Sequence, residues 1–348
     1  MTSKRNLVGL AWPALTDFFL ELGQPEYRAK QLMEWIYQHN VGDFSQMSNF
    51  PKELRQKLEE TAVVGAGEVV ARQVAADGTT KLAIAFSEDR IVECVILRYH
   101  YGVTLCLSSQ VGCKMGCAFC ASGLGGFVDN LTTAEIIEQI WQANQELAAQ
   151  GLRVGHLVYM GMGEPLDNYP QVIESIRFAN NPATFNIGMR NITVSTSGVV
   201  PGIRQLAEEN LPLTLSISLH APLDYLRDQI MPINQRYPLT ELMLAVRDYA
   251  RTSRRRVTFE YILLAGFNDQ LIHAEKLASL LAGIIANVNV IPYNEVPGLP
   301  WQAPSDKQIR FFLRALEARG VTATLRRELG PEIEAACGQL RRRLQGEE

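Results

Sequence analysis

The chain has 348 residues, of which 37 are acidic and 33 basic, so its formal net charge at pH 7 is −4. This balance argues weakly against bulk, non-specific nucleic-acid binding, although it leaves a local basic patch open. A chain of this length predicts one large domain with a small one, or two medium domains, and a core that needs no disulfide scaffold.

Residues 1–90 carry short helical patterns separated by turns. Apolar residues recur at helical spacing in 27–40, and 51–64 opens with a proline, as helices often do. After a glycine-rich turn, two strand-like runs flank Asp77-Gly78, which is a hairpin signal. We therefore expect a small helical domain over residues 1–90, with a short β extension at its end.

From residue 91 onward, strand-like and helical patterns alternate. The helical segment 132–151 has Thr132 and Glu135 as a capping box and Gly151 as a C-cap. Such alternation predicts an α/β fold whose parallel sheet has right-handed crossovers. About six such units suit an open doubly wound sheet or a full or partial barrel, and periodicity alone does not choose between them. The predicted strands are 91–97, 102–107, 155–160, 191–195, 213–219, 257–264 and 287–292.

The cysteines are unevenly distributed, and three of them form a C-x3-C-x2-C run directly after a strand-like segment. Three thiolates on one tight loop can hold three corners of a cubane iron–sulfur cluster and leave the fourth iron open to a small molecule. A structural zinc site would need a fourth ligand, for which His100 is the nearest histidine in sequence. A zinc site or an incidental thiol cluster is the alternative. The run consists of Cys113, Cys117 and Cys120, and the other cysteines are Cys94, Cys106 and Cys337.

This run, with the aromatic residue Phe119 before its last cysteine, is the signature of the radical S-adenosylmethionine superfamily. The segment LCLSSQVGCKMGCAFCASG (105–123) resembles the RlmN/Cfr family of RNA adenine-methylating enzymes more specifically. Further matches follow in collinear order over about residues 91–340, and the last of them is nearly unique to that family. They are YMGMGEPLDNY (159–169), VSTSGVVPGI (194–203), SISLHAP (216–222), MPINQRYPL (231–239), LLAGFNDQ (263–270), NVIPYNEV (289–296) and EAACGQL (334–340).

The resemblance implies a domain plan and two cofactors. Residues 1–90 would form a helical RNA-binding accessory domain, 91–340 a partial (β/α)6 radical-SAM barrel with a C-terminal cysteine loop, and 341–348 a charged tail. Cys113, Cys117 and Cys120 would hold one [4Fe–4S] cluster, whose fourth iron binds S-adenosylmethionine.

The resemblance also assigns contacts to S-adenosylmethionine, most of them at the ends of predicted strands. Ligands of parallel sheets bind at that edge, a glycine allows close approach of the backbone, and a carboxylate can pair with the cofactor's ammonium group. Without the resemblance, Gly163 could equally belong to an ordinary strand-to-helix turn, and His220 would be a satisfied core histidine. The assigned residues are Gly163, Glu164, Ser195, Ser218, Leu219, His220 and Asn294.

Three further residues receive chemical roles from the resemblance. Polar methyl transfer to an electrophilic adenine carbon fails, whereas a methylated cysteine can lose a hydrogen atom and attack as a carbon radical. Cys337 would be that carrier, methylated by one S-adenosylmethionine and activated by a second. Cys106 would release the product, leaving a transient Cys106–Cys337 disulfide that must be reduced. Glu93 matches the family's candidate proton acceptor, although Glu93 and Cys106 both stay open as the base, and Cys94 is expected to be a buried thiol.

The implied activity is methylation of adenine C2 in 23S rRNA, at the peptidyl transferase centre, and also in tRNA next to the anticodon. One alternative is the C8-methylating, antibiotic-resistance relative, which shares every catalytic residue named above. Another is a non-catalytic RNA-binding protein that holds an iron–sulfur cluster or zinc. The implied partners are 23S rRNA, tRNA and a flavodoxin-like or ferredoxin-like reductant, and the protein is expected to be a monomer.

Several surface features bear on RNA contacts and on location. Asp129 stands where the family usually has a basic residue, and Leu223 replaces a usual Asn. The N-terminus is charged, but its apolar stretch is short and broken by Pro13, and no A-x-A-like cleavage site follows, so we expect no secretory signal. Residues 280–291 are too short and too polar to span a bilayer, so we expect a cytoplasmic protein without membrane contact. The basic runs are candidate phosphate contacts or solvated faces. These runs are Arg254-Arg255-Arg256, Arg326-Arg327 and Arg341-Arg342-Arg343.

Overall fold

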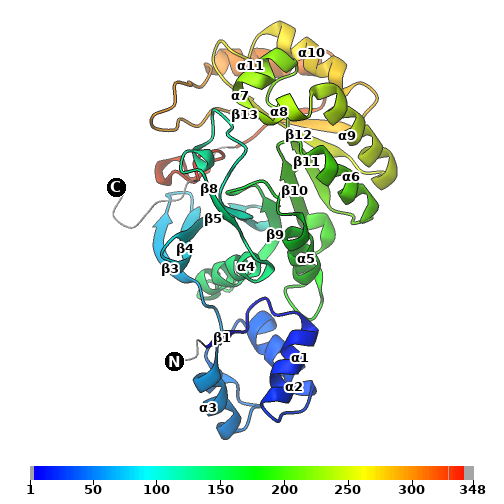
Figure 1. Cartoon of the computed structure of the whole chain (residues 1–348). Helices are drawn as coiled ribbons and strands as arrows, with labels where there is room; N and C mark the ends of the chain where they lie inside the picture. The colour runs from blue at the N-terminus through cyan, green and yellow to red at the C-terminus, as the bar shows by residue number, and fades with distance from the viewer. Residues whose placement is uncertain (1–3, 328, 341–348) are drawn as a thin grey trace.

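The computed structural model describes residues 4–327 and 329–340 (Figure 1). Its centre is a ten-stranded mixed sheet, in which the strands from β6 to β14 pair in parallel and those from β3 to β6 pair antiparallel. Among the described residues, β14 is an edge strand, so the barrel is open on one side. The sheet order is β14 (Ala323–Leu325), β13 (Ala286–Pro292), β12 (Val257–Leu263), β11 (Thr214–Ser218), β10 (Ile192–Thr196), β9 (Val154–Tyr159), β6 (Gly102–Cys106), β5 (Arg90–Tyr99), β4 (Thr80–Ser87) and β3 (Glu68–Val74).

The predicted α/β fold with a partial barrel is confirmed. All seven predicted strands are present, and helices separate most of the parallel ones. The first of these helices begins with the predicted capping box, in which Thr132 Oγ1 accepts a hydrogen bond from Glu135 N. The helices are α4 (Thr133–Ala148), α5 (Tyr169–Asn180), α6 (Val200–Glu208), α7 (Asp224–Ile230), α8 (Ile233–Arg236), α9 (Leu239–Ser253), α10 (Leu271–Leu281) and α11 (Asp306–Glu317).

The N-terminal segment is helical, and Figure 1 shows it beside one end of the central sheet. Its buried side chains belong to the same hydrophobic cluster as those of the barrel, so the two parts share a core. At the junction, a Cβ on Gly65 would lie 2.5 Å from the ring of Trp141 on α4, which explains why a glycine is needed there. The elements are α1 (Trp12–Glu21), α2 (Tyr27–Met33), a π-helical turn η1 (Glu34–Gln38) and α3 (Lys52–Thr61).

The hairpin predicted at Asp77-Gly78 connects β3 and β4, and Gly78 has the positive φ of 83° that this turn requires. Both strands lie in the central sheet, next to β5. Two small sheets complete the fold: β1 (Arg5–Asn6) with β2 (Ala62–Val63), and β7 (Gln110–Gly112) with β8 (Phe127–Asn130). None of the helices in the described part of the chain is long and apolar enough to cross a membrane.

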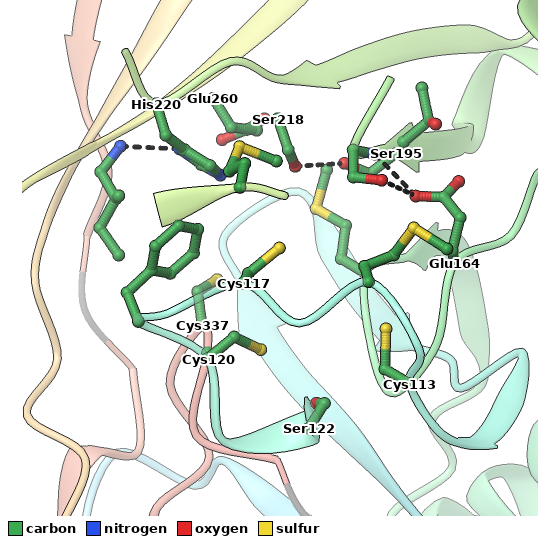
Figure 2. A pocket seen from close by; sticks show the side chains of 18 of the residues that line it. Cys113, Cys117, Cys120, Ser122, Glu164, Ser195, Ser218, His220, Glu260 and Cys337 are labelled. Atoms are coloured by element: carbon green, nitrogen blue, oxygen red, sulfur yellow. Dashed lines mark hydrogen bonds between the residues drawn. The ribbon is translucent and has the colours of Figure 1, made fainter. Parts of the chain in front are cut away.

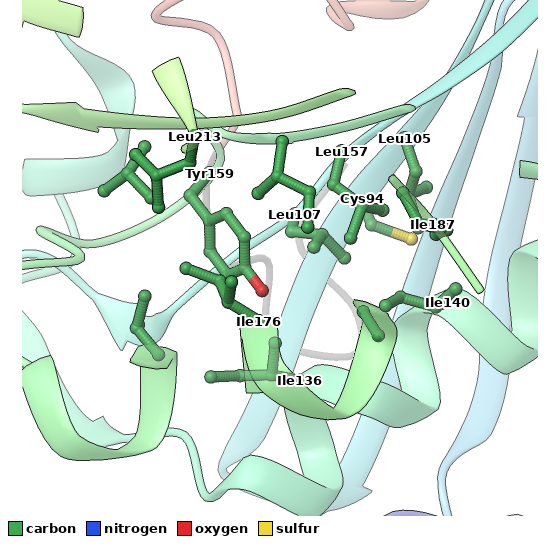
Figure 3. Close-up of a cluster of buried hydrophobic side chains, with 14 of the residues drawn as sticks. Cys94, Leu105, Leu107, Ile136, Ile140, Leu157, Tyr159, Ile176, Ile187 and Leu213 are labelled. Carbon is green, nitrogen blue, oxygen red and sulfur yellow. The ribbon is translucent and has the colours of Figure 1, made fainter. Parts of the chain in front are cut away.

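Alternation along β5 separates core residues from the functional face. Cys94 is fully buried, and Figure 3 shows it among apolar side chains such as Leu105 and Leu157. Burial raises the pKa of its thiol well above the ordinary value. The predicted buried thiol is therefore confirmed. Because successive strand residues face opposite sides, Glu93 and Val95 point to the other face of the sheet.

Candidate active site

The C-x3-C-x2-C loop borders a cavity at the carboxyl ends of the parallel strands, shown in Figure 2. We call this the strand-end cavity; its lining includes Cys113, Cys117, Cys120, Glu164, Ser195, Ser218, His220 and Cys337. A residue from a distant part of the chain also holds this loop, because Trp301 Nε1 donates a hydrogen bond of 2.9 Å to Ala118 O. The fold thus gathers these predicted site residues around one space.

The three cysteines fit an iron–sulfur cluster better than a single metal ion. In the described residues, no three His, Cys, Asp or Glu side chains converge as one metal ion would require. In a cubane cluster each cysteine binds a different iron, so the sulfurs stand apart around a shared space. Burial raises the pKa of all three thiols, that of Cys113 to about 12, so they become thiolates near pH 7 when an electropositive metal centre replaces their protons.

Glu164 is a fixed carboxylate on the wall of the strand-end cavity. Its Oε2 accepts hydrogen bonds of 2.7 Å from both the backbone N and the Oγ of Ser197, and its Oε1 accepts one from Leu166 N at 3.0 Å. Burial raises the pKa of this carboxyl, while the hydrogen bonds from Ser197 oppose that shift. A carboxylate has further lone pairs, so Glu164 retains the capacity to accept from a ligand's ammonium group.

Gly163 has a packing role that the sequence did not reveal. Its φ is +97°, and a Cβ there would lie 2.5 Å from Gln110 Cβ. At Gly161 a Cβ would lie 2.5 Å from Leu107 O. Both glycines therefore let the segment after β9 pack directly against the chain that leads into the cysteine loop.

Polar side chains at the next two strand ends complete the wall. Ser195 Oγ and Ser218 Oγ lie 3.3 Å apart across β10 and β11. His220 Nδ1 accepts a hydrogen bond from Ile262 N at 3.0 Å, which leaves the proton of the neutral ring on Nε2. Burial lowers the pKa of His220 to about 3, so the ring is neutral near pH 7. The Leu219 side chain lies in the hydrophobic core instead, so any ligand contact there would use its main chain.

A second space, the loop cavity, adjoins the first beneath the C-terminal loop (residues 329–340); its lining includes Cys106, Asn294, Arg326 and Cys337. Asn294 Nδ2 donates a hydrogen bond of 3.1 Å to Cys337 O. The loop is also tied to the cysteine motif, because Ala121 N donates to Gly338 O at 2.7 Å. Cys337 borders both cavities, whereas Cys106 borders only the loop cavity.

The predicted thiol pair is thus brought to one place, although it is not bonded. All six cysteines are free, so the expected Cys106–Cys337 disulfide is absent from this structure. Burial raises the pKa of Cys106 to about 12, and negative charge on Cys337 acts in the same direction. The structure therefore holds both cysteines as free thiols.

Glu260 was not predicted as a site residue, and the ion pair that it forms with Arg326 was not predicted either. Arg326 Nη1 lies 3.4 Å from Glu260 Oε2 inside the barrel, so this arginine is not part of an exposed basic run. Charge on Cys337 and on Glu260 raises the pKa of Arg326 well above its ordinary value. Glu260 interrupts the apolar strand VTFEYIL, as Glu93 interrupts IVECVIL. An acidic residue in a buried strand was the available signal.

Glu93 is buried rather than exposed to solvent. Its carboxylate Oε1 lies 3.2 Å from Lys81 Nζ on β4, and both side chains are almost fully enclosed. Val95 is the register partner of Cys106, so Glu93, two residues earlier, shares a face of the sheet with Cys106. Glu93 borders neither cavity in the described structure. The pairing with Lys81 was not predicted.

Comparisons with known proteins agree with this arrangement. Residues 5–64 match the model of the Ribosomal RNA large subunit methyltransferase N-terminal domain, and residues 107–278 match that of the Radical SAM superfamily. The "Probable dual-specificity RNA methyltransferase RlmN" of Symbiobacterium thermophilum is 46% identical over 98% of this chain and 92% of its own length. This chain belongs to the RlmN family. A relative with the same description from Geobacillus kaustophilus is 44% identical over 99% of this chain and 94% of its own.

A solved structure supports the same conclusion for this RlmN family member. The crystal structure of a radical SAM methyltransferase from Sphaerobacter thermophilus is similar with a TM-score of 0.93 and 40% identity, covering 97% of this chain and 99% of that one. The family is one of radical SAM methyltransferases that use a [4Fe–4S] cluster and S-adenosylmethionine. The enzyme class and both expected cofactors are therefore confirmed.

Two departures from the RlmN family pattern have local explanations. Asp129 forms an ion pair with Arg90, which also lies 2.8 Å from Glu135. Leu223 precedes α7 and packs against the small apolar cluster around Phe119. Of the basic runs, Arg254 ends α9 with a left-handed conformation, and Arg341, Arg342, Arg343 and the tail 341–348 lie outside the described residues.

Proposed function

We propose that this enzyme methylates C2 of a specific adenine in 23S rRNA and of the adenine next to the anticodon in tRNA. The observation that carries the proposal is the position of Cys337, which borders both the cavity of the three-cysteine motif and the cavity of Cys106. The relatives' description as dual-specificity RNA methyltransferases supports the choice of two RNA substrates.

Within the strand-end cavity, we assign Cys113, Cys117 and Cys120 to the cluster. When bound, the cluster and S-adenosylmethionine supply a 5′-deoxyadenosyl radical. The wall residues would orient the cofactor: the Glu164 carboxylate accepts from its ammonium group, and the neutral His220 ring offers an Nε2–H donor. Gly163, Ser195, Ser218, Asn294 and the main chain of Leu219 are the further proposed contacts.

The two thiols of the loop cavity would have different roles: Cys337 would carry the methyl group, and Cys106 would release the product. Cys337 accepts the methyl group first and becomes a thioether, whose methyl carbon, after losing a hydrogen atom, adds to the electrophilic adenine ring and links RNA to protein. Addition leaves one unpaired electron on the ring, which the bound cluster would take back. Cys106 then attacks the Cys337 sulfur, so that the sulfur–carbon bond breaks, a Cys106–Cys337 disulfide forms, and the freed carbon takes up a proton to complete the methyl group. A flavodoxin-like or ferredoxin-like partner would return both cysteines to the free thiols found here.

The adenine ring loses its C2 proton after the Cys337 carbon has added to it and before Cys106 attacks the Cys337 sulfur. We assign this proton removal to Glu93, a buried carboxylate on the same face of the sheet as Cys106. The C2 proton passes to the carboxylate, and its electron pair stays with the ring until the sulfur–carbon bond breaks. Cys106 remains the other candidate for this base.

The proposal also covers RNA recognition, oligomeric state and location in the cell. We assign RNA recognition by shape to residues 1–90, which include the segment matched by the N-terminal family model. We further propose that the enzyme acts as a monomer in the cytoplasm, where both RNAs are found.

Nucleoside analysis of RNA treated with the reconstituted enzyme tests the proposal. We expect 2-methyladenosine in both a 23S rRNA fragment and tRNA; 8-methyladenosine would identify the other branch of the family instead. Cys337→Ala should abolish the product while the iron content is unchanged. Cys94→Ala, which removes a cysteine on the opposite face of the sheet, is the matched control and should remain active. Zinc in place of iron would contradict the radical reaction altogether.

A further inference from the structure

Lys81 is a buried charged residue whose position the proposed reaction does not yet explain. It lies on β4 within an apolar strand pair, and its side chain is only 4% exposed. Lysine is almost never buried to this extent unless it is paired. Its Nζ lies 3.2 Å from Glu93 Oε1 and donates a hydrogen bond of 3.3 Å to Glu334 O in the C-terminal loop. One ammonium group therefore bridges the proposed base and the loop that carries Cys337.

Strand register gives this bridge a defined place. Lys81 is the partner of Val95 on β5, and Val95 is in turn the partner of Cys106 on β6. Cross-strand partners point to the same side of a sheet, so Lys81 and Cys106 stand in one row, with Glu93 on the adjacent position of the same face. The C-terminal loop contacts this row through Glu334. The base, the releasing thiol and the loop that carries the methyl carrier therefore all lie against one face of the sheet.

Stability alone is a poor reason for such a pair. Removing two charges from water costs several kcal/mol per ion, and apolar side chains of similar size commonly stabilise a core as well or better. On the same face of the sheet, the neighbouring β5 residues Val95 and Leu97 are apolar and buried. An ion pair in this setting needs a chemical reason.

We propose that Lys81 is a positioning residue for the release half of the reaction, which holds the Glu93 carboxylate by an ion pair in a fixed position relative to the Cys337 loop. This inference rests on the proposed function, in which Glu93 takes the ring proton. Lys81 itself forms and breaks no covalent bond: it keeps its proton, and the proton from adenine C2 goes to the Glu93 carboxylate. The earlier steps, methylation of Cys337 and addition of its carbon to the ring, do not use the carboxylate.

The inference predicts a defect confined to one step. In Lys81→Met, the methyl group on Cys337 should form as in the wild type, because that step precedes the use of Glu93. The covalent RNA–protein adduct should then accumulate even though Cys106 is intact. Release of methylated RNA should slow by about 100-fold, the lower range for loss of a general base. Glu93→Gln should behave in the same way.

The experiment uses the full-length, reconstituted enzyme and three readouts. These are intact mass for methylated Cys337, denaturing gels for the RNA–protein adduct, and nucleoside analysis for product. Lys81→Gln, which is neutral but can still donate to Glu334 O, replaces Lys81→Met if the latter fails to fold. Lys81→Arg keeps the charge and should restore release without the adduct. Lys276→Met, at an exposed position on α10, is the control and should match the wild type in all three readouts.

Cys106→Ala separates the two proposals. If it accumulates adduct while the neutral Lys81 variants do not, the release mechanism stands and the inference about Lys81 is wrong. A parallel loss of Cys337 methylation, adduct and product in those variants would likewise reduce Lys81 to a purely structural role. If Cys106→Ala gives no adduct although the wild type turns over, the release mechanism fails, and the role of Lys81 falls with it.

Discussion

The two sides of the active site are built in different ways. On the strand-end side, Glu164, Ser195 and Ser218 follow successive parallel strands, whose carboxyl ends share one edge of the sheet. On the thiol side, antiparallel strands align Lys81 and Cys106 in a cross-strand row, and the C-terminal loop covers them. The first side is assembled from short motifs in chain order. The second depends on register and on a distant segment of the chain.

This difference suggests a division of labour. The strand-end side would bind and orient a cofactor through fixed acceptors, so changes there should affect every step. The thiol side would handle the methyl group and its release, so changes there should stop the cycle at a defined intermediate. The following predictions test this division, from the largest expected effect to the smallest.

Removal of a cluster ligand should have the largest effect. Cys117→Ala leaves two thiolates for a cluster that needs three, so iron content and product should both fall to background. Iron analysis together with nucleoside analysis measures this. Cys94→Ala should keep both, because its thiol lies in the core on the other face of β5. A Cys117→Ala enzyme with normal iron content and activity would contradict the assignment of the ligands.

Removal of the releasing thiol should have a more selective effect. Cys106→Ala should retain the cluster and the methylated Cys337 but release product about 100-fold more slowly, because no thiolate attacks the Cys337 sulfur. The RNA–protein adduct should appear on denaturing gels. If the adduct is missing and the cluster is lost, the two sides of the site are not functionally separate.

A methyl group at Gly163 should disrupt the packing of the strand-end side against the chain that leads into the cysteine loop. Gly163→Ala forces a φ of +97° on alanine and places its Cβ 2.5 Å from Gln110 Cβ, so we expect a loss of at least about 2 kcal/mol in the free energy of unfolding. Denaturant unfolding measures this loss. Gly125→Ala is the control, since a Cβ there meets nothing within 4 Å. Equal stability of the two variants would refute the packing argument.

The smallest effect concerns pH and the strand-end side. The pKa of His220 is lowered from 6.5 to about 3 by burial, so the unfolded chain binds this proton at a higher pH than the folded chain. Folding stability should therefore fall as the pH drops below 6.5, by up to about 1.4 kcal/mol per pH unit. Denaturant unfolding at about pH 7 and about pH 5.5 should show a smaller decrease in His220→Gln than in the wild type. The control His39→Gln, at an exposed position, should keep the wild-type decrease.

Local sequence patterns predicted most of the strand-end side. The three-cysteine run and the residues at strand ends were identified from spacing and resemblance, because each motif lies next to the element that positions it. The strands of the barrel were likewise identified by their apolar runs. The thiol side was predicted only in part: Cys106, Glu93 and Cys337 were named, but not the buried partner Lys81.

The sequence by itself determined the α/β fold, the cysteine motif and the membership of Cys94 in the core, since these depend on local periodicity and burial. Only the tertiary structure decided that Lys81 pairs with Glu93, that Arg326 lies inside the barrel with Glu260, and that Cys337 borders both cavities. The physical reason is that a buried charge must find its partner across strands. Strand register and loop closure choose that partner, and no local pattern in the chain encodes it.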